Sequence, residues 1–149
     1  MLDLFRRLFS YDKWAIGRSL GSIGGSQRSE AALLLSHILL AEKIWLTRLR
    51  GGDSAHIPTF EEFSLDECEI MANDLHRGYL EFIDSLSEKG LDQLINYRNT
   101  KGVEFSTPIC EILMHVGVHG AYHRGQIAWL VRAGGGTAVN TDYITYTRL

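Results

Sequence analysis

The chain has few cysteines, no long apolar run and no excess of basic residues, and each absence excludes a class of protein. Cys68 and Cys110 are the only cysteines among 149 residues, and they form no CxxC pair. This number is typical of free thiols in a reducing compartment and not of a disulfide framework. We therefore predict a cytoplasmic protein.

Features of membrane and nucleic-acid-binding proteins are also missing. No run of roughly eighteen apolar residues occurs, so no helix is expected to span a membrane. Residues 1–7 include an aspartate and two arginines, which interrupt the apolar core that a signal peptide needs. The net charge is −3 and no basic stripe stands out, so we expect no nucleic-acid partner.

What the sequence does contain is the pattern of a helical domain. Its 149 residues, 45% of them hydrophobic, are enough for one domain with its own core. Apolar residues recur at helical spacing over 3–21, 29–50, 64–89 and 107–133. The glycine-rich segment 21–26 breaks the first of these stretches. The third begins with Ser64 and Glu67, which match the S-x-x-E pattern of a capping box.

A β-hairpin is predicted before the last helical stretch. Residues 94–98 and 103–106 read as two short strands around the turn Asn-Thr-Lys-Gly at 99–102. The tail at 141–146 is expected to be extended. We therefore predict an all-α four-helix bundle over residues 1–149, with the hairpin inserted between the third and fourth helices. The two middle connections are long enough for neighbouring helices to run parallel.

The run from His115 to Gln126 contains three histidines at intervals of four, the others being His119 and His123. On a helix this spacing places their imidazoles on successive turns of one side. Two imidazoles one turn apart can bind one divalent transition metal. At about 100° per residue, His123 lies near the centre of the apolar stripe and His119 beside it, while His115 lies on the flank.

A third ligand is available from the second helix. His37 lies among apolar residues on the predicted buried face of that helix. Three inward histidines are costly to bury without partners, and a shared metal would satisfy all of them. We therefore predict a metal site of His37, His119 and His123 with positions left for water or substrate. The alternative is that these histidines are hydrogen-bonded core residues.

Other polar residues carry weaker signals. Glu42 and Glu111 lie away from the inward stripes and are expected on solvated faces, so no di-iron site is predicted. Arg124 and Gln126 follow His123 and either contact an anionic substrate or orient a ligand. The competing interpretation is a surface salt bridge and a helix-edge amide. No catalytic residue can be assigned.

The sequence resembles the DinB-like, or damage-inducible, metal-binding four-helix bundles of bacteria. The matching segments are Tyr11-Asp-Lys-Trp-Ala15, the ten residues from His37 to Leu46, the 115–126 run and the tail at 141–144. The resemblance implies an up-down-down-up bundle, often a homodimer. It also implies a metal, commonly zinc or nickel, held by His37, His119 and His123, with iron, manganese and copper as further candidates.

One position departs from the family pattern. The family often has a histidine immediately before the last ligand, where this chain has Tyr122. Ligation should be unaffected, but the surroundings of the site change. His115, Tyr122, Arg124 and Gln126 are therefore candidates for contacts with the ligands or with a substrate.

Two functions follow from the resemblance and stay open. Related bundles include transferases and an isomerase that use low-molecular-weight thiols, although a shared fold does not transfer a substrate. The first hypothesis is a metal-dependent enzyme, a thiol S-transferase or a hydrolase, in which the metal activates a thiol or water. The second is a non-catalytic, metal-stabilised bundle or stress-linked binding protein. The first is favoured because only three ligands are visible.

Overall fold

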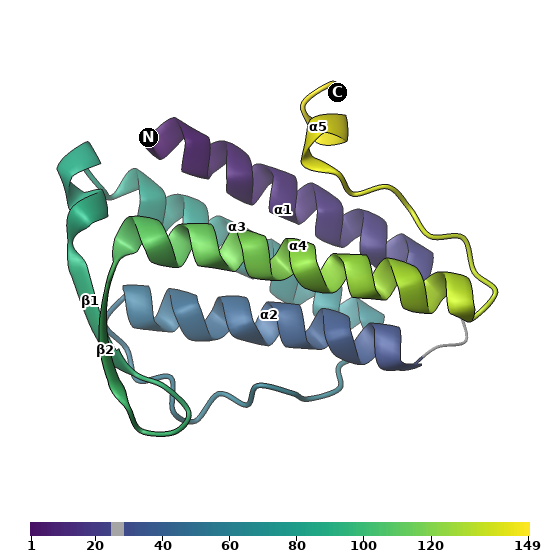
Figure 1. Cartoon of the computed structure of the whole chain (residues 1–149), viewed down its shortest axis with the longest axis horizontal. Coiled ribbons are helices and arrows are strands. Elements are labelled where there is room, and N and C mark those ends of the chain that lie inside the picture. Colours follow the sequence, from purple (N-terminus) through teal and green to yellow (C-terminus); the bar gives the residue numbers. More distant parts are fainter. Residues whose placement is uncertain (25–28) are drawn as a thin grey trace.

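Four long helices pack into a bundle (Figure 1). The computed structural model describes residues 1–24 and 29–149. The helices match the four predicted stretches, with these bounds: α1 Leu2–Ile23, α2 Ser29–Leu49, α3 Leu65–Asp84 and α4 Ile109–Ala133. Helix α1 continues past its predicted end at Gly21, and residues 25 and 26 of the predicted break lie outside the described residues.

The helices follow an up-down-down-up order. Helices α1 and α4 run in one direction, while α2 and α3 run in the other (Figure 1). Each of α3 and α4 packs against both α1 and α2, so α1 and α2 face each other across a diagonal. The segment 50–64 runs from the end of α2 back along the bundle to the start of α3 (Figure 1). Helices α2 and α3 can therefore run in the same direction. The predicted fold class is confirmed.

Helix α3 ends earlier than predicted. Its last residue is Asp84, and a short 3-10 helix, η1, follows at Glu88–Asp92. The Ser87 hydroxyl caps η1 by accepting a hydrogen bond from the Gly90 backbone N–H at 3.1 Å. This turn directs the fully buried Leu91 into the core. The predicted stop near Lys89 therefore falls inside a second element.

The predicted hairpin is present and links η1 to α4. Strand β1 (Leu94–Arg98) pairs antiparallel with β2 (Glu104–Pro108). The pair Arg98 and Glu104 closes the ladder beside the turn, and their side chains form an ion pair. The hairpin extends beyond the end of the bundle and lies beside the start of the 50–64 segment (Figure 1).

The tail differs from its prediction. Residues Tyr143–Tyr146 form a single helical turn, α5, and not an extended segment. The Tyr11 hydroxyl donates a hydrogen bond to the Thr141 carbonyl at 2.8 Å, and the Tyr11 ring packs edge-on against Tyr143 at 5.1 Å. Aromatic packing against α1 thus holds the tail, an interaction that the local sequence pattern does not reveal.

The core is made by apolar side chains from all four long helices. At its centre the ring of Phe9 in α1 stacks on that of Tyr79 in α3, with centroids 4.2 Å apart. None of the helices within the described residues combines the length and hydropathy needed to cross a membrane.

Candidate metal centre

Three histidines from two adjacent helices meet at one point. Helix α2 supplies His37, and α4 supplies His119 and His123 from successive turns. Each contributes one ring nitrogen to a group whose members all lie within 4.8 Å of one another. The ring centroid of His37 is 5.1 Å from that of His119 and 4.8 Å from that of His123. The structure thus brings together the three residues expected to be ligands.

Hydrogen bonds orient two of the three rings. The Nδ1 atom of His37 lies 2.7 Å from the Thr59 carbonyl oxygen, and that of His123 lies 2.6 Å from Oε1 of Gln126. Because both partners are acceptors, Nδ1 is the donor in each contact, which leaves Nε2 of each ring as the nitrogen available to a metal. Metal-binding histidines commonly have this arrangement, in which an outer acceptor fixes the tautomer and the ring orientation.

The segment 50–64 completes one side of the site. Besides Thr59, it supplies Phe60, whose ring stacks on His37 with centroids 4.1 Å apart and planes 8° apart. These two contacts hold His37 in two directions, one in the plane of the ring and one on its face. Sequence analysis missed both residues, because a loop without periodicity gives no indication of what it covers.

The electrostatics of the cluster favour neutral imidazoles. Burial, together with the neighbouring His123, His37 and His115, lowers the pKa of His119 to about 4. Burial also lowers the pKa of His37, with His123 acting in the same direction and the hydrogen bond to Thr59 opposing it. At neutral pH both rings therefore offer the uncharged form that a metal requires.

The donor set fits a divalent first-row metal. Three neutral imidazoles suit zinc, nickel, copper or iron, with geometry and availability deciding among them. Across residues 1–24 and 29–149, no fourth histidine, cysteine or carboxylate joins the group. A three-ligand set of this kind is typical of sites that keep a coordination position for water or substrate.

The remaining candidates lie around this group. His115 is outside it: its ring packs edge-on against Trp45 at 5.3 Å and lies 5.7 Å from the ring of His119. Tyr122 is exposed and presents its ring edge-on to His123 at 5.1 Å. Gln126 is the hydrogen-bond acceptor of His123.

Arg124 points away from the site, contrary to both interpretations of the sequence. Only 1% of the residue is exposed, and its Nη1 donates to Oδ1 of Asp12 in α1 at 2.5 Å. It therefore neither reaches a substrate at the surface nor forms a surface salt bridge. One sequence signal could have found it: Gly120 lies one turn earlier and makes room for the guanidinium, because an added Cβ there would lie 2.8 Å from Nη1.

Glu42 also differs from its prediction. It was expected on a solvated face but is 4% exposed, next to the Asp12–Arg124 pair. Burial, reinforced by the negative charge of Asp12, raises its pKa well above the usual range. Because the surrounding helices all contribute to this polar cluster, the pattern of α2 alone does not indicate it.

Comparison with known proteins agrees with this geometry. The DinB family matches residues 18–149 of the chain. Among curated proteins, Protein DinB of Bacillus subtilis (strain 168) is 26% identical over 121 residues, which cover 76% of this chain and 69% of that protein. Among solved structures, a DinB-like protein from Bacillus cereus ATCC 10987 has a TM-score of 0.66 at 18% identity.

The structural likeness covers 91% of this chain and 94% of the Bacillus cereus chain, and at this identity it concerns the fold alone. The family match is the stronger finding, because it includes α2, α4 and all three histidines. The chain therefore belongs to the DinB family.

Proposed function

We propose that this protein is a metal-dependent enzyme that binds one divalent transition metal through His37, His119 and His123 and transfers a small thiol to an electrophile. One observation carries the proposal: three ring nitrogens lie within 4.8 Å of one another, and no fourth ligand type joins them within the described residues. A bound metal of this kind lowers the pKa of a coordinated thiol or water and so supplies a nucleophile near neutral pH.

The residues around the ligands have separate roles in this proposal. Thr59 and Gln126 keep Nε2 of His37 and His123 directed toward the common point. The exposed rings of Phe60 and Tyr122 flank the cluster and give a substrate an apolar surface on which to pack. Tyr122 replaces a histidine common in the family, so its hydroxyl is the contact most specific to this chain.

The choice of a thiol as substrate rests on the family resemblance. The expectation of zinc or nickel as the metal rests on it as well. In the transfer, the sulfur forms a bond to an electrophilic carbon, the bond from that carbon to the leaving group breaks, and the thiol proton passes to solvent. A hydrolase would use the same ligands with water in place of the thiol. The non-catalytic alternative is a metal that only joins α2 to α4 and stabilises the bundle.

Metal content is the first test. The untagged protein should contain about one zinc or nickel per chain by plasma mass spectrometry, as a single three-histidine site requires. The double variant His119→Ala/His123→Ala should contain none. His115→Ala is the matched control, because this residue is on the same helix but outside the group. Full metal occupancy in the double variant would contradict the ligand assignment.

Activity then separates the three functions. The metal-loaded protein is incubated with cysteine or glutathione and 1-chloro-2,4-dinitrobenzene, and the coloured conjugate is followed with time. Transfer above the rate of the double variant supports the thiol enzyme. Hydrolysis of p-nitrophenyl acetate without conjugate formation favours the hydrolase. A rise in melting temperature on metal loading, with neither activity, favours the stabilised bundle.

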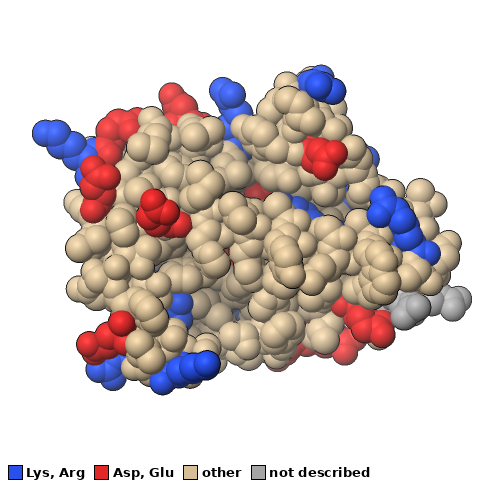
Figure 2. All heavy atoms as spheres, viewed as in Figure 1, with Lys and Arg blue, Asp and Glu red and all other residues tan. Residues whose placement is uncertain are grey.

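A homodimer in the cytoplasm is part of the same proposal, and the outward face of α4 is the surface that supports it. Met114, Val118, Tyr122 and Trp129 are exposed there, and Figure 2 shows the charged side chains mostly around the rim of this view. Tyr122 and Trp129 are 64% and 66% exposed, so at ~150–250 Å² for a whole aromatic side chain these two offer roughly 200–300 Å² together. A stable dimer buries about 800 Å² per partner, so this face can supply the apolar centre of an interface between two copies.

A further inference from the structure

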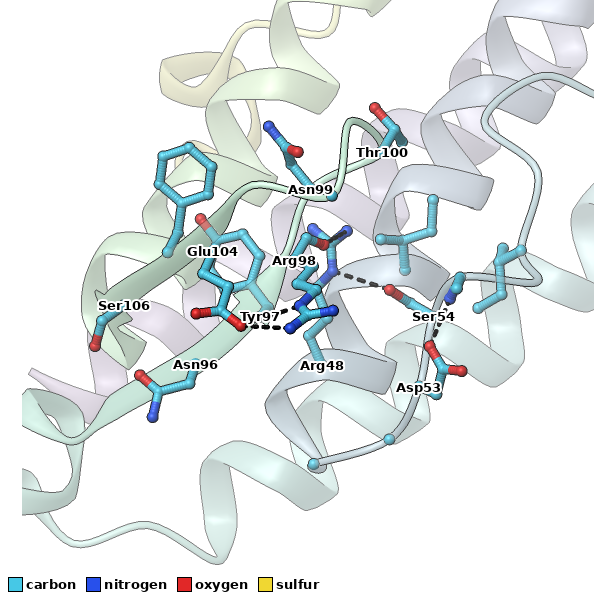
Figure 3. Close-up of a pocket in the computed structure, with 17 residues that line it drawn as sticks. Arg48, Asp53, Ser54, Asn96, Tyr97, Arg98, Asn99, Thr100, Glu104 and Ser106 are labelled. Carbon is cyan, nitrogen blue, oxygen red and sulfur yellow. Dashed lines mark hydrogen bonds and ion pairs between the residues drawn. The ribbon is translucent and has the colours of Figure 1, made fainter.

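A cavity of about 1260 Å³ lies at the hairpin end of the bundle, away from the three histidines. It is open to solvent and is lined by the C-terminal part of α2, the start of the 50–64 segment and the β1–β2 hairpin (Figure 3). None of His37, His119 and His123 lines it. The ring of Trp45 packs edge-on against both Tyr97 of the cavity and His115 of α4, so it separates the cavity from the row of histidines.

Two arginines, Arg48 and Arg98, and two carboxylates, Asp53 and Glu104, line this cavity. Arg98 is paired with Glu104 across the hairpin, with Nη2 and Oε1 2.6 Å apart. Asp53 accepts a hydrogen bond from the backbone N–H of Ala55 at 2.9 Å. Arg48 is different, because no carboxylate among the described residues forms an ion pair with it. The cavity thus contains one guanidinium, that of Arg48, which no carboxylate contacts, although Asp53 also lines the cavity.

Neutral groups hold this guanidinium in place. Its Nε donates to the Ser54 hydroxyl at 2.9 Å, and its Nη2 donates to the Arg98 carbonyl at 3.0 Å. Its carbon atom Cζ lies 4.7 Å from the centre of the Trp45 ring and 4.8 Å from that of Tyr97. Figure 3 shows Arg48 in the middle of the lining residues, between the hairpin and the segment carrying Ser54.

These contacts leave donors available. The two hydrogen bonds use Nε and Nη2, and no described residue accepts from Nη1. Burial lowers the pKa of the Arg48 guanidinium, as expected for a cation that has lost hydration without gaining a carboxylate. A fixed guanidinium of this kind is well suited to an oxyanion, because its planar fork matches carboxylate and phosphate oxygens and little rotamer entropy remains to be lost.

We propose that this cavity is a second binding site, in which Arg48 recognises the carboxylate or phosphate group of a small polar molecule. The rest of the lining suits the body of such a ligand, since Asn96, Thr100 and Ser106 offer polar groups and Phe105 an apolar surface. The site goes beyond the proposed metal chemistry and does not depend on it, because it shares no residue with the histidine cluster.

The test is a titration of the metal-free protein followed by NMR, observing Arg48 Nε–H and the backbone amides of Gly51, Gly52 and Gly102. Sodium phosphate and sodium succinate are added in separate series, with sodium chloride at matched ionic strength as the reference. Saturable shifts with either oxyanion but not with chloride support the site. The stronger of the two identifies the ligand group as phosphate or carboxylate. Shifts that merely follow ionic strength overturn the proposal.

Variants separate recognition from a purely structural role of Arg48. Arg48→Gln should weaken oxyanion binding by about tenfold or more, as expected for loss of a charge-assisted contact. Ser54→Asp supplies the missing carboxylate beside Nε, so it should keep the hairpin in place and still abolish binding. Arg132→Gln, at the exposed end of α4, should bind like the wild type. Undiminished binding in folded Ser54→Asp would overturn the assignment.

Discussion

Asp12 of α1 and Arg124 of α4 form an ion pair that is almost completely buried, with Nη1 and Oδ1 2.5 Å apart. Arg124 directly follows His123, so one turn of α4 contributes both a candidate ligand and the charged link to α1. The Nε and Nη2 atoms of Arg124 have no hydrogen-bond partner among the described residues. The stability of this ion pair therefore depends strongly on how closely the surrounding side chains pack around it.

Removing the cation should destabilise the fold severely. In Arg124→Met, Asp12 and Glu42 are left buried without a positive charge, and breaking a buried ion pair on one side costs about 3–5 kcal/mol. The free energy of unfolding from urea titration measures the loss. Arg132→Met, an exposed arginine on the same helix, should stay within ~0.5 kcal/mol of the wild type. A similar small effect for Arg124→Met would mean that the pair contributes little.

Gly120 should tolerate no side chain. A Cβ at this position would lie 2.8 Å from Nη1 of Arg124 and 3.0 Å from Oδ1 of Asp12. Gly120→Ala is expected to lower the free energy of unfolding by about 1–3 kcal/mol through overpacking, despite the better helix propensity of alanine. Gly17→Ala in α1 is the control, because nothing lies within 4 Å of its added Cβ. The control should be neutral or stabilising, and equal effects at the two sites would refute the steric argument.

The buried proton on Glu42 predicts a pH dependence of stability. Asp12 from α1, Tyr79 from α3 and Arg124 from α4 surround this residue, and burial followed by the Asp12 charge raises its pKa well above its ordinary value. The folded protein thus keeps a proton that the unfolded chain releases above about pH 4.5. By linkage, the contribution of Glu42 to stability is full below that pH and is lost as the pH rises toward the folded pKa.

Glu42→Gln isolates this effect, because the amide imitates the protonated acid at every pH. The difference in unfolding free energy between wild type and variant should shift in favour of the variant between pH 5 and pH 8. Urea titrations at several pH values provide the measurement, and the histidine contributions cancel in the difference. A difference independent of pH would show that Glu42 is ionised in the folded protein.

Much of the fold was predictable because local rules decide it. The Ser64 hydroxyl accepts from the Glu67 backbone N–H at 3.2 Å, and Oε2 of Glu67 accepts from the Ser64 backbone N–H at 2.8 Å, as the S-x-x-E pattern predicts. The end of α3 was not predictable from periodicity, since Leu86 beyond the helix still packs against the core. Hydrophobic spacing reports which residues are buried and not which backbone conformation buries them.

The candidate site likewise contains residues that the sequence predicts and residues that it does not. His119 and His123 follow from their spacing on one helix, and His37 follows from the apolar residues around it. Thr59 and Phe60 could not be predicted, because their positions depend on where a 15-residue segment, 50–64, runs along the bundle. Glu42 was misplaced because a helix pattern marks a charged residue as exposed unless a partner on another element is known. Tertiary partners of polar residues are the information that one sequence lacks.

The side-chain oxygen of Gln126, which accepts a hydrogen bond from His123, should control metal affinity. In Gln126→Ala the Nδ1 atom of His123 loses its hydrogen bond, and loss of such outer contacts typically weakens metal binding by about 10–100-fold. Competition with a chromophoric chelator for zinc measures the affinity. Gln126→Glu retains an acceptor oxygen and should restore most of the binding. An unchanged affinity in the alanine variant would show that the ring is oriented by packing alone.

A charged side chain on the outward face of α4 should abolish dimerisation through that face. Trp129 and Tyr122 expose 66% and 64% of their surface there, so in a two-fold dimer each meets the equivalent region of the other copy. Trp129→Lys places like charges at this interface and leaves the buried core untouched, so it should convert the proposed dimer to a monomer without lowering helicity. Size-exclusion chromatography with light scattering gives the mass.

Ile70→Lys is the matched control, because Ile70 is 64% exposed but lies on α3, which packs diagonally opposite α4. Dissociation by Ile70→Lys and not by Trp129→Lys would move the interface to α3, and a monomeric wild type would remove it.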